Sequence, residues 1–150
     1  MQNLIPPPVV VVIIGGLMWG MSQLLTFGAF GFVWQKGLAL GLLVLGAALM
    51  VLAAGSFFTV KTTINPMRPA RASSLVTTGL FSFSRNPIYL GDLLLLIALF
   101  IWLGNAINIV FLPLFVWFIN RFQIEAEERA LSQLFGDTYL DYCKKVRRWI

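Results

Sequence analysis

The stretch GLALGLLVLGAALMVLAAGSFF, residues 37–58, decides the fold class of this chain. It has 22 residues and no charged side chain. A helix of about 20 apolar residues is long enough to cross the hydrocarbon core of a bilayer. The stretch therefore predicts a transmembrane helix, and small residues such as Gly41, Gly46 and Ala53 suit close packing against another helix.

The composition of the whole chain also indicates an integral membrane protein. Of its 150 residues, 59% are hydrophobic and 11% are charged, and the mean hydropathy is +0.85. Soluble domains have about 25% charged residues. The net charge of +5 comes largely from Lys and Arg in residues 61–85 and 144–148, as is typical of cytoplasmic loops and tails near anionic lipids. No basic stripe is interleaved with aromatic residues on a soluble module, so we expect no nucleic-acid binding.

Three further apolar runs complete the predicted set of helices. They cover residues 6–27, 88–103 and 107–119. The first is too long for a signal peptide and follows no basic residue, so we interpret it as a retained transmembrane helix. The last two are short and flank the turn GNAIN, residues 104–108, which predicts a tight helical hairpin with its return arm kinked at Pro113.

These patterns predict an all-α integral membrane protein with about four transmembrane helices in a single membrane domain, residues 1–150. Residues 1–58 would hold two transmembrane helices, 59–87 a cytoplasmic loop, 88–120 the hairpin, and 121–150 a cytoplasmic segment with an amphipathic helix. An even number of crossings and the basic loop and tail place both termini in the cytoplasm. We expect the membrane to be a bacterial inner membrane.

Two residue types that often carry chemistry are scarce in this chain. It has no His, and Cys143 is its one cysteine. The usual zinc ligand and the usual general base at neutral pH are therefore missing, and neither an internal disulfide nor a site with several Cys ligands can form. We expect no metal site.

The stretch SRNPIYLGD, residues 84–92, concentrates polar groups where an apolar run begins. Asn86 and Pro87 are typical of a helix start, with Asn as the N-cap and Pro as the first helical residue. A helix start does not account for the nearby Arg85, Tyr89 and Asp92. An ionisable residue inside a membrane helix is by default a functional hypothesis. Asp92 lies about one turn into the helix, so it either serves a site or extends back to the interface.

The segment RFQIEAEERALSQLFG, residues 121–136, has the period of an amphipathic helix. Its polar face carries Arg121, Glu125, Glu128, Arg129 and Ser132. Charges on this face can pair at a spacing of four residues and need no function. Glu127 instead projects into the apolar side, one turn after Gln123. A buried carboxylate needs a cation or several donors, so Glu127 either pairs with Arg85 or receives the ammonium group of a ligand.

Two segments resemble the isoprenylcysteine carboxyl methyltransferase family. They are TTGLFSFSRNPIYLG, residues 77–91, and EERALSQLFGDTYLDYCKKVRRW, residues 127–149. Phospholipid N-methyltransferases are similar in the second segment, and the resemblance covers about residues 66–149. It implies a methyltransferase that works within the membrane, uses S-adenosylmethionine, and acts on an amphiphilic or small lipophilic acceptor with a carboxylate, thiol or amine group.

The resemblance also implies which residues contact the two substrates. The cofactor-binding residues would be Ser73, Ser74, Leu75, Val76, Phe81, Asn86, Pro87, Ile88, Tyr89 and Glu127. The acceptor would be contacted by Gln123, Arg121 and Arg85. No residue is singled out as catalytic, because the methyl donor is already activated and the protein mainly aligns the acceptor with it.

The chain departs from the family's pattern at three of these positions. Asn86 replaces a His, and Phe81 replaces a Tyr and so lacks its hydroxyl. Gln123 stands where isoprenylcysteine enzymes use an Arg to hold the substrate carboxylate. An uncharged amide cannot supply that charge or a bidentate fork, so the departure argues against a prenylcysteine acceptor.

The sequence leaves open two functions other than methyl transfer. Membrane reductases of related C-terminal architecture use NADPH, whose phosphates would need basic residues such as Arg68, Arg71 and Arg85. A small membrane subunit without enzymatic activity would use its polar residues only to pack helices. Affinity for S-adenosylmethionine, for NADPH or for neither distinguishes the three.

Overall fold

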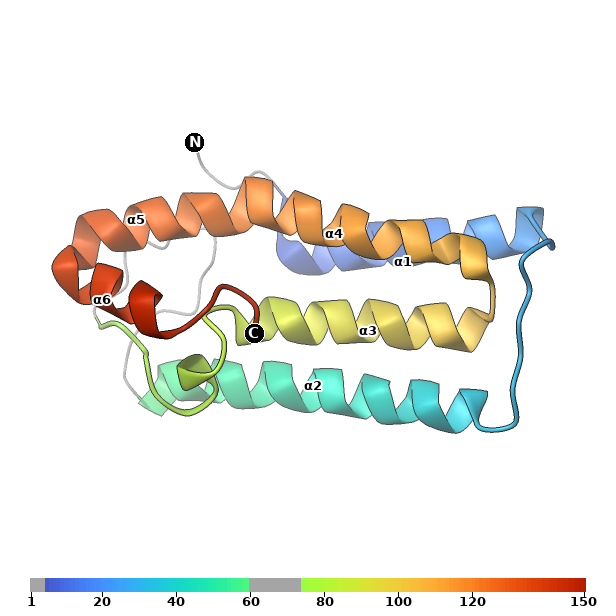
Figure 1. Ribbon diagram of the computed structural model, residues 1–150, viewed down its shortest axis with the longest axis horizontal. Coiled ribbons are helices and arrows are strands. Elements are labelled where there is room, and N and C mark those ends of the chain that lie inside the picture. The colour runs from blue at the N-terminus through green and yellow to red at the C-terminus, as the bar shows by residue number, and fades with distance from the viewer. Residues whose placement is uncertain (1–4, 60–73) are drawn as a thin grey trace.

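The computed structural model describes residues 5–59 and 74–150, and long helices make up most of them. The long helices lie side by side along the long axis of the molecule (Figure 1). The helices are α1 (Pro7–Leu24), α2 (Gln35–Thr59), α3 (Pro87–Leu103), α4 (Phe111–Ile119), α5 (Glu125–Phe135) and α6 (Asp137–Lys145). The described residues form no β-strand, and the predicted all-α class is confirmed.

The lengths of the rods agree with a membrane protein of about four spanning helices. Three helical stretches are long and apolar enough to cross a bilayer: Pro7–Leu24, Gln35–Phe57 and Ala106–Phe135. The fourth, α3, is apolar and has 17 residues, which corresponds to about 25 Å at 1.5 Å per residue. It reaches across most of a hydrocarbon core of about 30 Å.

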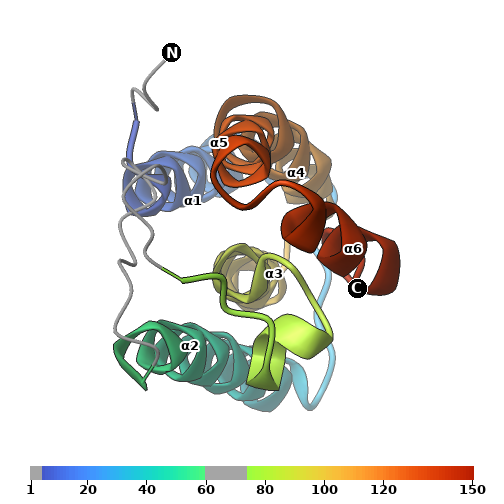
Figure 2. The same ribbon diagram turned by 90° about the vertical axis from the view of Figure 1, so that its left-hand side faces the viewer.

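Helix α3 lies at the centre of the bundle. An end-on view shows α2 on one side of it and α1 and α4 on the other (Figure 2). Leu96 of α3, Met18 of α1 and Phe115 of α4 are almost completely buried and belong to one apolar cluster. The other helices can face lipid, whereas α3 is surrounded by protein, so polar groups on α3 can be kept away from hydrocarbon.

Two glycines allow α2 and α3 to touch through their backbones. A Cβ atom added to Gly46 would lie 2.9 Å from the carbonyl oxygen of Gly91, and one added to Gly91 would lie 2.8 Å from that of Gly46. Real Cβ atoms do not approach so closely, so both positions require glycine. Helices in lipid pack through such small residues, because burial of apolar surface gives no advantage there.

At one end of the bundle, polar side chains bind the backbone of the turns. Asn105 Nδ2 donates to the carbonyl of Leu25 at 2.6 Å, and Lys36 Nζ donates to that of Trp102 at 2.7 Å. Backbone groups near hydrocarbon have no water to bind, so such internal partners are needed. The predicted turn at residues 104–108 is stabilised in this way, and Gly104 adopts a positive φ of 62° there.

The return arm of the predicted hairpin is longer than the sequence suggested. Helix α4 continues through a π-helical segment, Asn120–Ile124, directly into α5, so that residues 106–135 form one rod. Pro113 lies in the first turn of α4, where its missing N–H breaks no hydrogen bond of that helix. Two segments of this rod depart from α-helical geometry, the 3-10 segment Ala106–Val110 before α4 and the π segment after it. A kink at Pro113 itself stays a prediction.

Replacing Gly46 by Val should separate α2 from α3. The new side chain would clash with the Gly91 backbone, and overpacking of this kind costs about 1–3 kcal/mol. Gly41→Val is the matched control, because a Cβ added there would have no heavy atom of another described segment within 4 Å. Thermal unfolding in detergent, followed by circular dichroism, should show a lower Tm for the Gly46 variant alone. Equal Tm values for the two variants would contradict the close packing.

Candidate functional site

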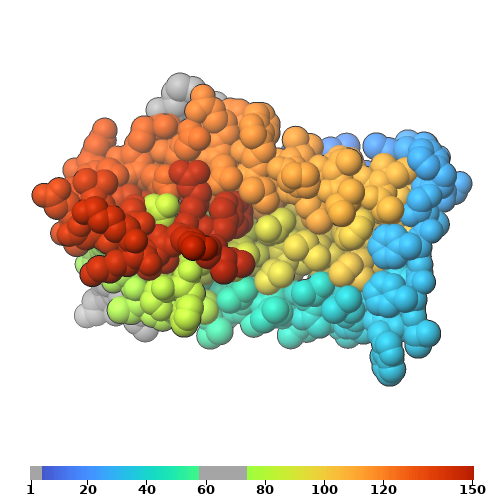
Figure 3. Space-filling model, in the orientation of Figure 1, coloured from blue at the N-terminus to red at the C-terminus, as the bar shows by residue number. Residues whose placement is uncertain are grey.

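A cavity of about 310 Å³ lies where α3 begins. Its walls come from α1, α2, residues 74–92, α5 and α6, which gather at the end of the bundle that faces the viewer in Figure 2. In the space-filling view the C-terminal residues lie against residues of the 74–86 segment (Figure 3). The volume is at the small end of the range of about 300–1,000 Å³ that is usual for ligand sites.

Tyr89 of α3 and Glu127 of α5 form the central polar contact of this cavity. The Tyr89 hydroxyl donates to Glu127 Oε1 at 2.5 Å, and only 5% of Tyr89 is exposed. Within residues 5–59 and 74–150, no cation lies within 4 Å of the Glu127 carboxylate. The internal pair between Glu127 and Arg85, one of the two predicted alternatives, is therefore wrong for the described part of the chain.

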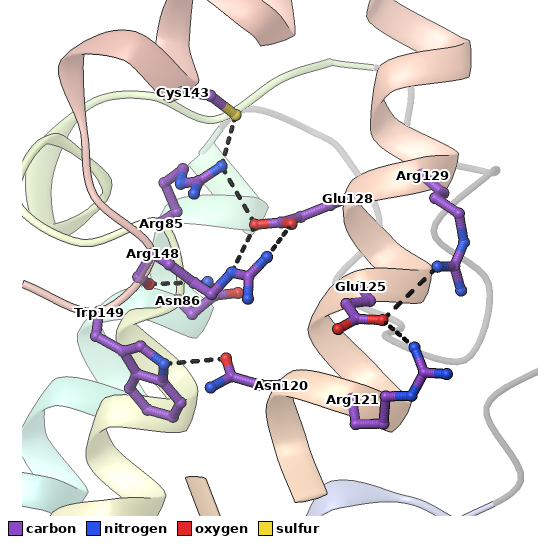
Figure 4. Close-up of polar contacts among 10 residues, drawn as sticks. All are labelled: Arg85, Asn86, Asn120, Arg121, Glu125, Glu128, Arg129, Cys143, Arg148 and Trp149. Atoms are coloured by element: carbon purple, nitrogen blue, oxygen red, sulfur yellow. Dashed lines mark hydrogen bonds and ion pairs between the residues drawn. The ribbon is translucent and has the colours of Figure 1, made fainter. Parts of the chain in front are cut away.

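Arg85 pairs with Glu128 instead. Its Nη1 atom lies 3.2 Å from Glu128 Oε1 and also donates to Cys143 Sγ at 2.6 Å. Arg148 approaches the same carboxylate with two donors, Nη2 at 2.6 Å and Nε at 3.1 Å (Figure 4). This hydrogen-bonded pair raises the pKa of Arg148 above its ordinary value. We call Arg85, Glu128 and Arg148 the ion-pair network.

Glu128 is thus not the solvent-facing residue that the helical pattern predicted. Its side chain is 21% exposed, against 32% for Glu125 on the same helix. The predicted pairing of charges four residues apart is confirmed for Glu125, which pairs with Arg121 at 2.7 Å and with Arg129 at 3.9 Å. Glu128 differs because α6 and the residues after it return to cover it, which a single helix cannot reveal.

The start of α3 is held by the C-terminal segment. Asn86 is the N-cap and Pro87 the first helical residue, as predicted. However, the Asn86 side chain makes no capping hydrogen bond, and its Nδ2 donates to the carbonyl of Arg148 at 2.9 Å. The backbone N–H of Arg85 donates to the carbonyl of Arg147 at 3.0 Å. Arg85 and Asn86 therefore bind the backbone of residues about 60 positions later in the chain.

Two tyrosines of α6 complete the cavity, and the sequence analysis missed them. Tyr139 and Tyr142 are buried and line it. Tyr142 Oη donates to the carbonyl of Phe81 at 2.6 Å, and burial raises the pKa of Tyr142 to about 12, so this hydroxyl keeps its proton at neutral pH. The sequence did contain one sign of their role: a spacing of three residues puts both rings on one face of a helix.

Nearly all of the predicted cofactor-binding residues gather at the cavity. Its lining includes Ser74, Leu75, Val76, Phe81, Asn86, Pro87, Ile88, Tyr89 and Glu127. Ser73 lies outside the described residues. Glu128, which the sequence did not single out, also lines the cavity. Asp92 lines it too and is buried, as in the first of the two alternatives predicted for it.

The three residues predicted to contact the acceptor lie in different places. Arg85 lines the cavity. Gln123 does not line it; this side chain is 1% exposed and donates to the carbonyl of Ile5 at 2.5 Å. The Arg121 side chain is 62% exposed and is paired with Glu125 outside the cavity. The described residues contain no group of three His, Cys, Asp or Glu that could hold a metal ion.

Comparison with known proteins identifies a related family. The family described as phospholipid methyltransferase matches residues 34–138. Protein-S-isoprenylcysteine O-methyltransferase of Rattus norvegicus is 33% identical over 116 residues, which are 75% of this chain and 40% of that protein. The B form of Arabidopsis thaliana is 30% identical over 116 residues, 75% of this chain and 57% of that protein.

A bacterial relative is similar over a shorter stretch. A Haemophilus influenzae protein described as uncharacterized is 46% identical over 63 residues, which are 42% of this chain and the whole of that protein. The chain spans only 40% and 57% of the rat and Arabidopsis methyltransferases. Its similarity to those enzymes therefore concerns part of their length.

Replacing Glu128 by Gln should loosen the C-terminal segment from α3. The variant loses partly buried, charge-assisted hydrogen bonds, and we expect a loss of roughly 1–3 kcal/mol of stability. Glu125→Gln is the control, since its pairs are more exposed and should contribute at most about 0.5 kcal/mol. Thermal unfolding and limited proteolysis in detergent should show a lower Tm and faster cleavage near the C-terminus only for the Glu128 variant. Equal behaviour of the two variants would argue against the network.

Proposed function

The chain belongs to the phospholipid methyltransferase family, and from this premise we propose that it transfers a methyl group from S-adenosylmethionine to a lipophilic acceptor within the membrane. The rat and Arabidopsis relatives are named as methyltransferases, and the described helices are long and apolar enough for an integral membrane protein. The cofactor and the kind of acceptor are proposed from the chemistry of the residues that line the cavity.

The single observation that carries the proposal is the Glu127 carboxylate. It lines the cavity, accepts a hydrogen bond from Tyr89, and has no cation partner among the described residues. A carboxylate away from water is costly without a positive charge beside it. S-adenosylmethionine carries a sulfonium and an ammonium group, so a ligand of this kind fits the residues that are present.

Each part of the site has a role in this proposal. Glu127 would hold the ammonium group, and the Tyr89 hydroxyl fixes the orientation of that carboxylate. Ser74 and Asn86 lie on the cavity wall and would position other polar groups of the ligand. When bound, the cofactor supplies an activated methyl group that needs no base of its own. The protein then acts mainly through alignment and exclusion of water.

The acceptor would enter along the apolar side of the cavity. Pro7 and Pro8 of α1 and Met50 and Ala54 of α2 form this side. Such residues suit the hydrocarbon part of a lipid or another amphiphile. The start of α1 and helix α6 both line the cavity, so they lie at the same end of the bundle. The Lys and Arg residues within 144–148 support the proposal that this end, with both termini, faces the cytoplasm at a bacterial inner membrane.

NADPH fits the described cavity less well. Its phosphates would require cations, and Arg85, the one cationic residue in the described lining, is paired with Glu128 at 3.2 Å. Arg68 and Arg71 lie outside the described residues. The binding experiment below includes NADPH, whose preferential binding would favour the reductase alternative.

Removing the Glu127 carboxylate should abolish tight cofactor binding. Glu127→Ala should weaken the Kd for S-adenosylmethionine about 10- to 100-fold, which corresponds to the 1.5–3 kcal/mol of a hydrogen bond to a charged group. Glu125→Ala should bind like the wild type, because its pairs lie on the exposed face. Calorimetry on the detergent-purified protein measures both. Unchanged affinity in the Glu127 variant would refute this role, and a wild type that binds no S-adenosylmethionine would refute the proposed function.

Tyr89→Phe tests whether the tyrosine acts through Glu127. Loss of the hydroxyl should weaken cofactor binding about tenfold, the effect of one hydrogen bond to a charged group. The double variant with Glu127→Ala should then bind no more weakly than Glu127→Ala alone, because residues that act on the same contact are not additive. Additive losses would mean that Tyr89 contributes independently of the carboxylate.

A further inference from the structure

The C-terminal segment carries exposed basic residues that the proposed function does not use. Lys144, Lys145 and Arg147 are all exposed. Lys144 pairs with Asp141 of the same helix at 2.8 Å. Lys145 and Arg147 have no acidic partner within 4 Å among the described residues. We call these two residues the basic patch, and their uncompensated charges attract an anionic partner.

Arg147 also touches the proposed site through its backbone. Its carbonyl accepts the hydrogen bond from the backbone N–H of Arg85, a residue of the cavity wall, at 3.0 Å. Val146 before it has an extended backbone and is buried with the two tyrosines of α6, and Arg148 after it pairs with Glu128. Successive side chains of an extended segment point to opposite sides. The Arg147 guanidinium therefore points outward while its carbonyl holds the segment that begins α3.

Apolar side chains near the basic patch indicate that this surface lies at the membrane interface. Figure 1 shows the end of the chain at the level of the start of α3 along the bundle axis. Trp149 packs against the apolar cluster of the bundle and donates to Asn120 Oδ1 at 3.1 Å. Phe83, two residues before Arg85, is 78% exposed, and Ile150 is 77% exposed. Large apolar side chains beside basic ones are typical of a surface in the headgroup region of a bilayer.

We infer that Lys145 and Arg147 bind the phosphates of anionic phospholipids at the membrane surface, and that this contact strengthens cofactor binding. The planar guanidinium of Arg147 suits a phosphate group, and Lys145 adds a second positive charge. The bound lipid belongs to the surrounding bilayer and is not the methyl acceptor. The lipid contact stands without the proposed function, whereas its effect on the cofactor rests on that function.

The link between the two sites follows from the double contact of Arg147. An anionic lipid that holds the Arg147 side chain favours the arrangement in which its carbonyl binds Arg85. In the same arrangement Asn86 binds the carbonyl of Arg148, and the tyrosines of α6 line the cavity. A ligand that binds one arrangement better stabilises it. The lipid should therefore tighten cofactor binding, and the cofactor should tighten lipid binding by the same factor.

The first experiment measures the lipid contact without the cofactor. The full chain in a non-ionic detergent is titrated with dihexanoyl phosphatidylglycerol or with dihexanoyl phosphatidylcholine, and its Tm is followed. The wild type should be stabilised by the anionic lipid only. Arg147→Gln keeps the backbone carbonyl and should bind this lipid about fivefold more weakly, the usual effect of one basic residue near an anionic surface. Adding Lys145→Gln should bring the loss to about 25-fold.

Arg129→Gln is the control for this experiment. Arg129 is also an exposed basic residue near the same end of the bundle, but it pairs with Glu125 on α5. Its replacement should leave the affinity for phosphatidylglycerol unchanged. Inorganic phosphate serves as the soluble probe of the same chemistry. Stabilisation by inorganic phosphate equal to that by phosphatidylglycerol would overturn the assignment to a lipid.

The second experiment measures the effect on the cofactor. The Kd for S-adenosylhomocysteine, the demethylated cofactor, is compared in nanodiscs of phosphatidylcholine with and without about one third phosphatidylglycerol. The anionic lipid should lower the Kd of the wild type about fivefold, and Arg147→Gln should lose this difference while Arg129→Gln keeps it.

Three results would overturn the inference. They are equal stabilisation by the two short-chain lipids, unchanged lipid affinity in the variant that lacks both charges of the basic patch, and a wild-type cofactor Kd that is the same in both membranes. In each of these the proposed function survives. A wild type that binds no cofactor in either membrane would instead remove the proposed function, and the Tm titration would still decide the lipid contact.

Discussion

The ion-pair network around Glu128 is the interaction on which the cavity depends. It joins the residue before α3, a residue of α5 and a residue after α6, and these lie 20 to 63 positions apart in the chain. Arg148 contacts the carboxylate with two donors, a geometry that fixes orientation as well as distance. Part of the network is exposed, which limits its contribution to stability, and the same contacts also fix the placement of these segments. With α6 held back over the bundle, Tyr139 and Tyr142 can close the cavity.

The central position of α3 explains why polar chemistry is concentrated at one end of this apolar protein. At the far end, the side chains of Asn105 and Lys36 donate hydrogen bonds to backbone carbonyls of the turns. Along the middle of α3, residues such as Leu96 and Ala98 are buried and apolar. Near the start of the helix, Tyr89 donates to Glu127, and Asp92 lines the cavity with its Oδ2 unpartnered among the described residues. A surrounding layer of protein is what makes these groups tolerable at that depth.

The sequence predicted the features that depend on local spacing. An uncharged run specified α2, Asn86 and Pro87 marked the start of α3, and the four-residue spacing from Arg121 to Glu125 predicted their ion pair. The sequence could not predict the partners of Glu128 or of the Asn86 side chain. These come from residues near the C-terminus, and helix periodicity contains no information on where a later segment returns. The resemblance supplied the grouping of Ser74, Asn86 and Glu127, which spacing alone would not have brought together.

The π segment between α4 and α5 explains why Gln123 is buried and bound to the residue that precedes α1. A π turn holds one residue more than an α turn, so the residues after it face about 100° away from where a regular helix would place them. In this segment Gln123 and Ile124 are turned inward and are almost completely buried. The Gln123 amide binds the carbonyl of Ile5, immediately before the start of α1, where Pro7 lines the cavity. The resemblance implied that Gln123 stands where isoprenylcysteine enzymes use an Arg to bind the acceptor; in the structure its amide instead anchors the residue before Pro6 and α1. A carboxylate acceptor would therefore find no cation at this position.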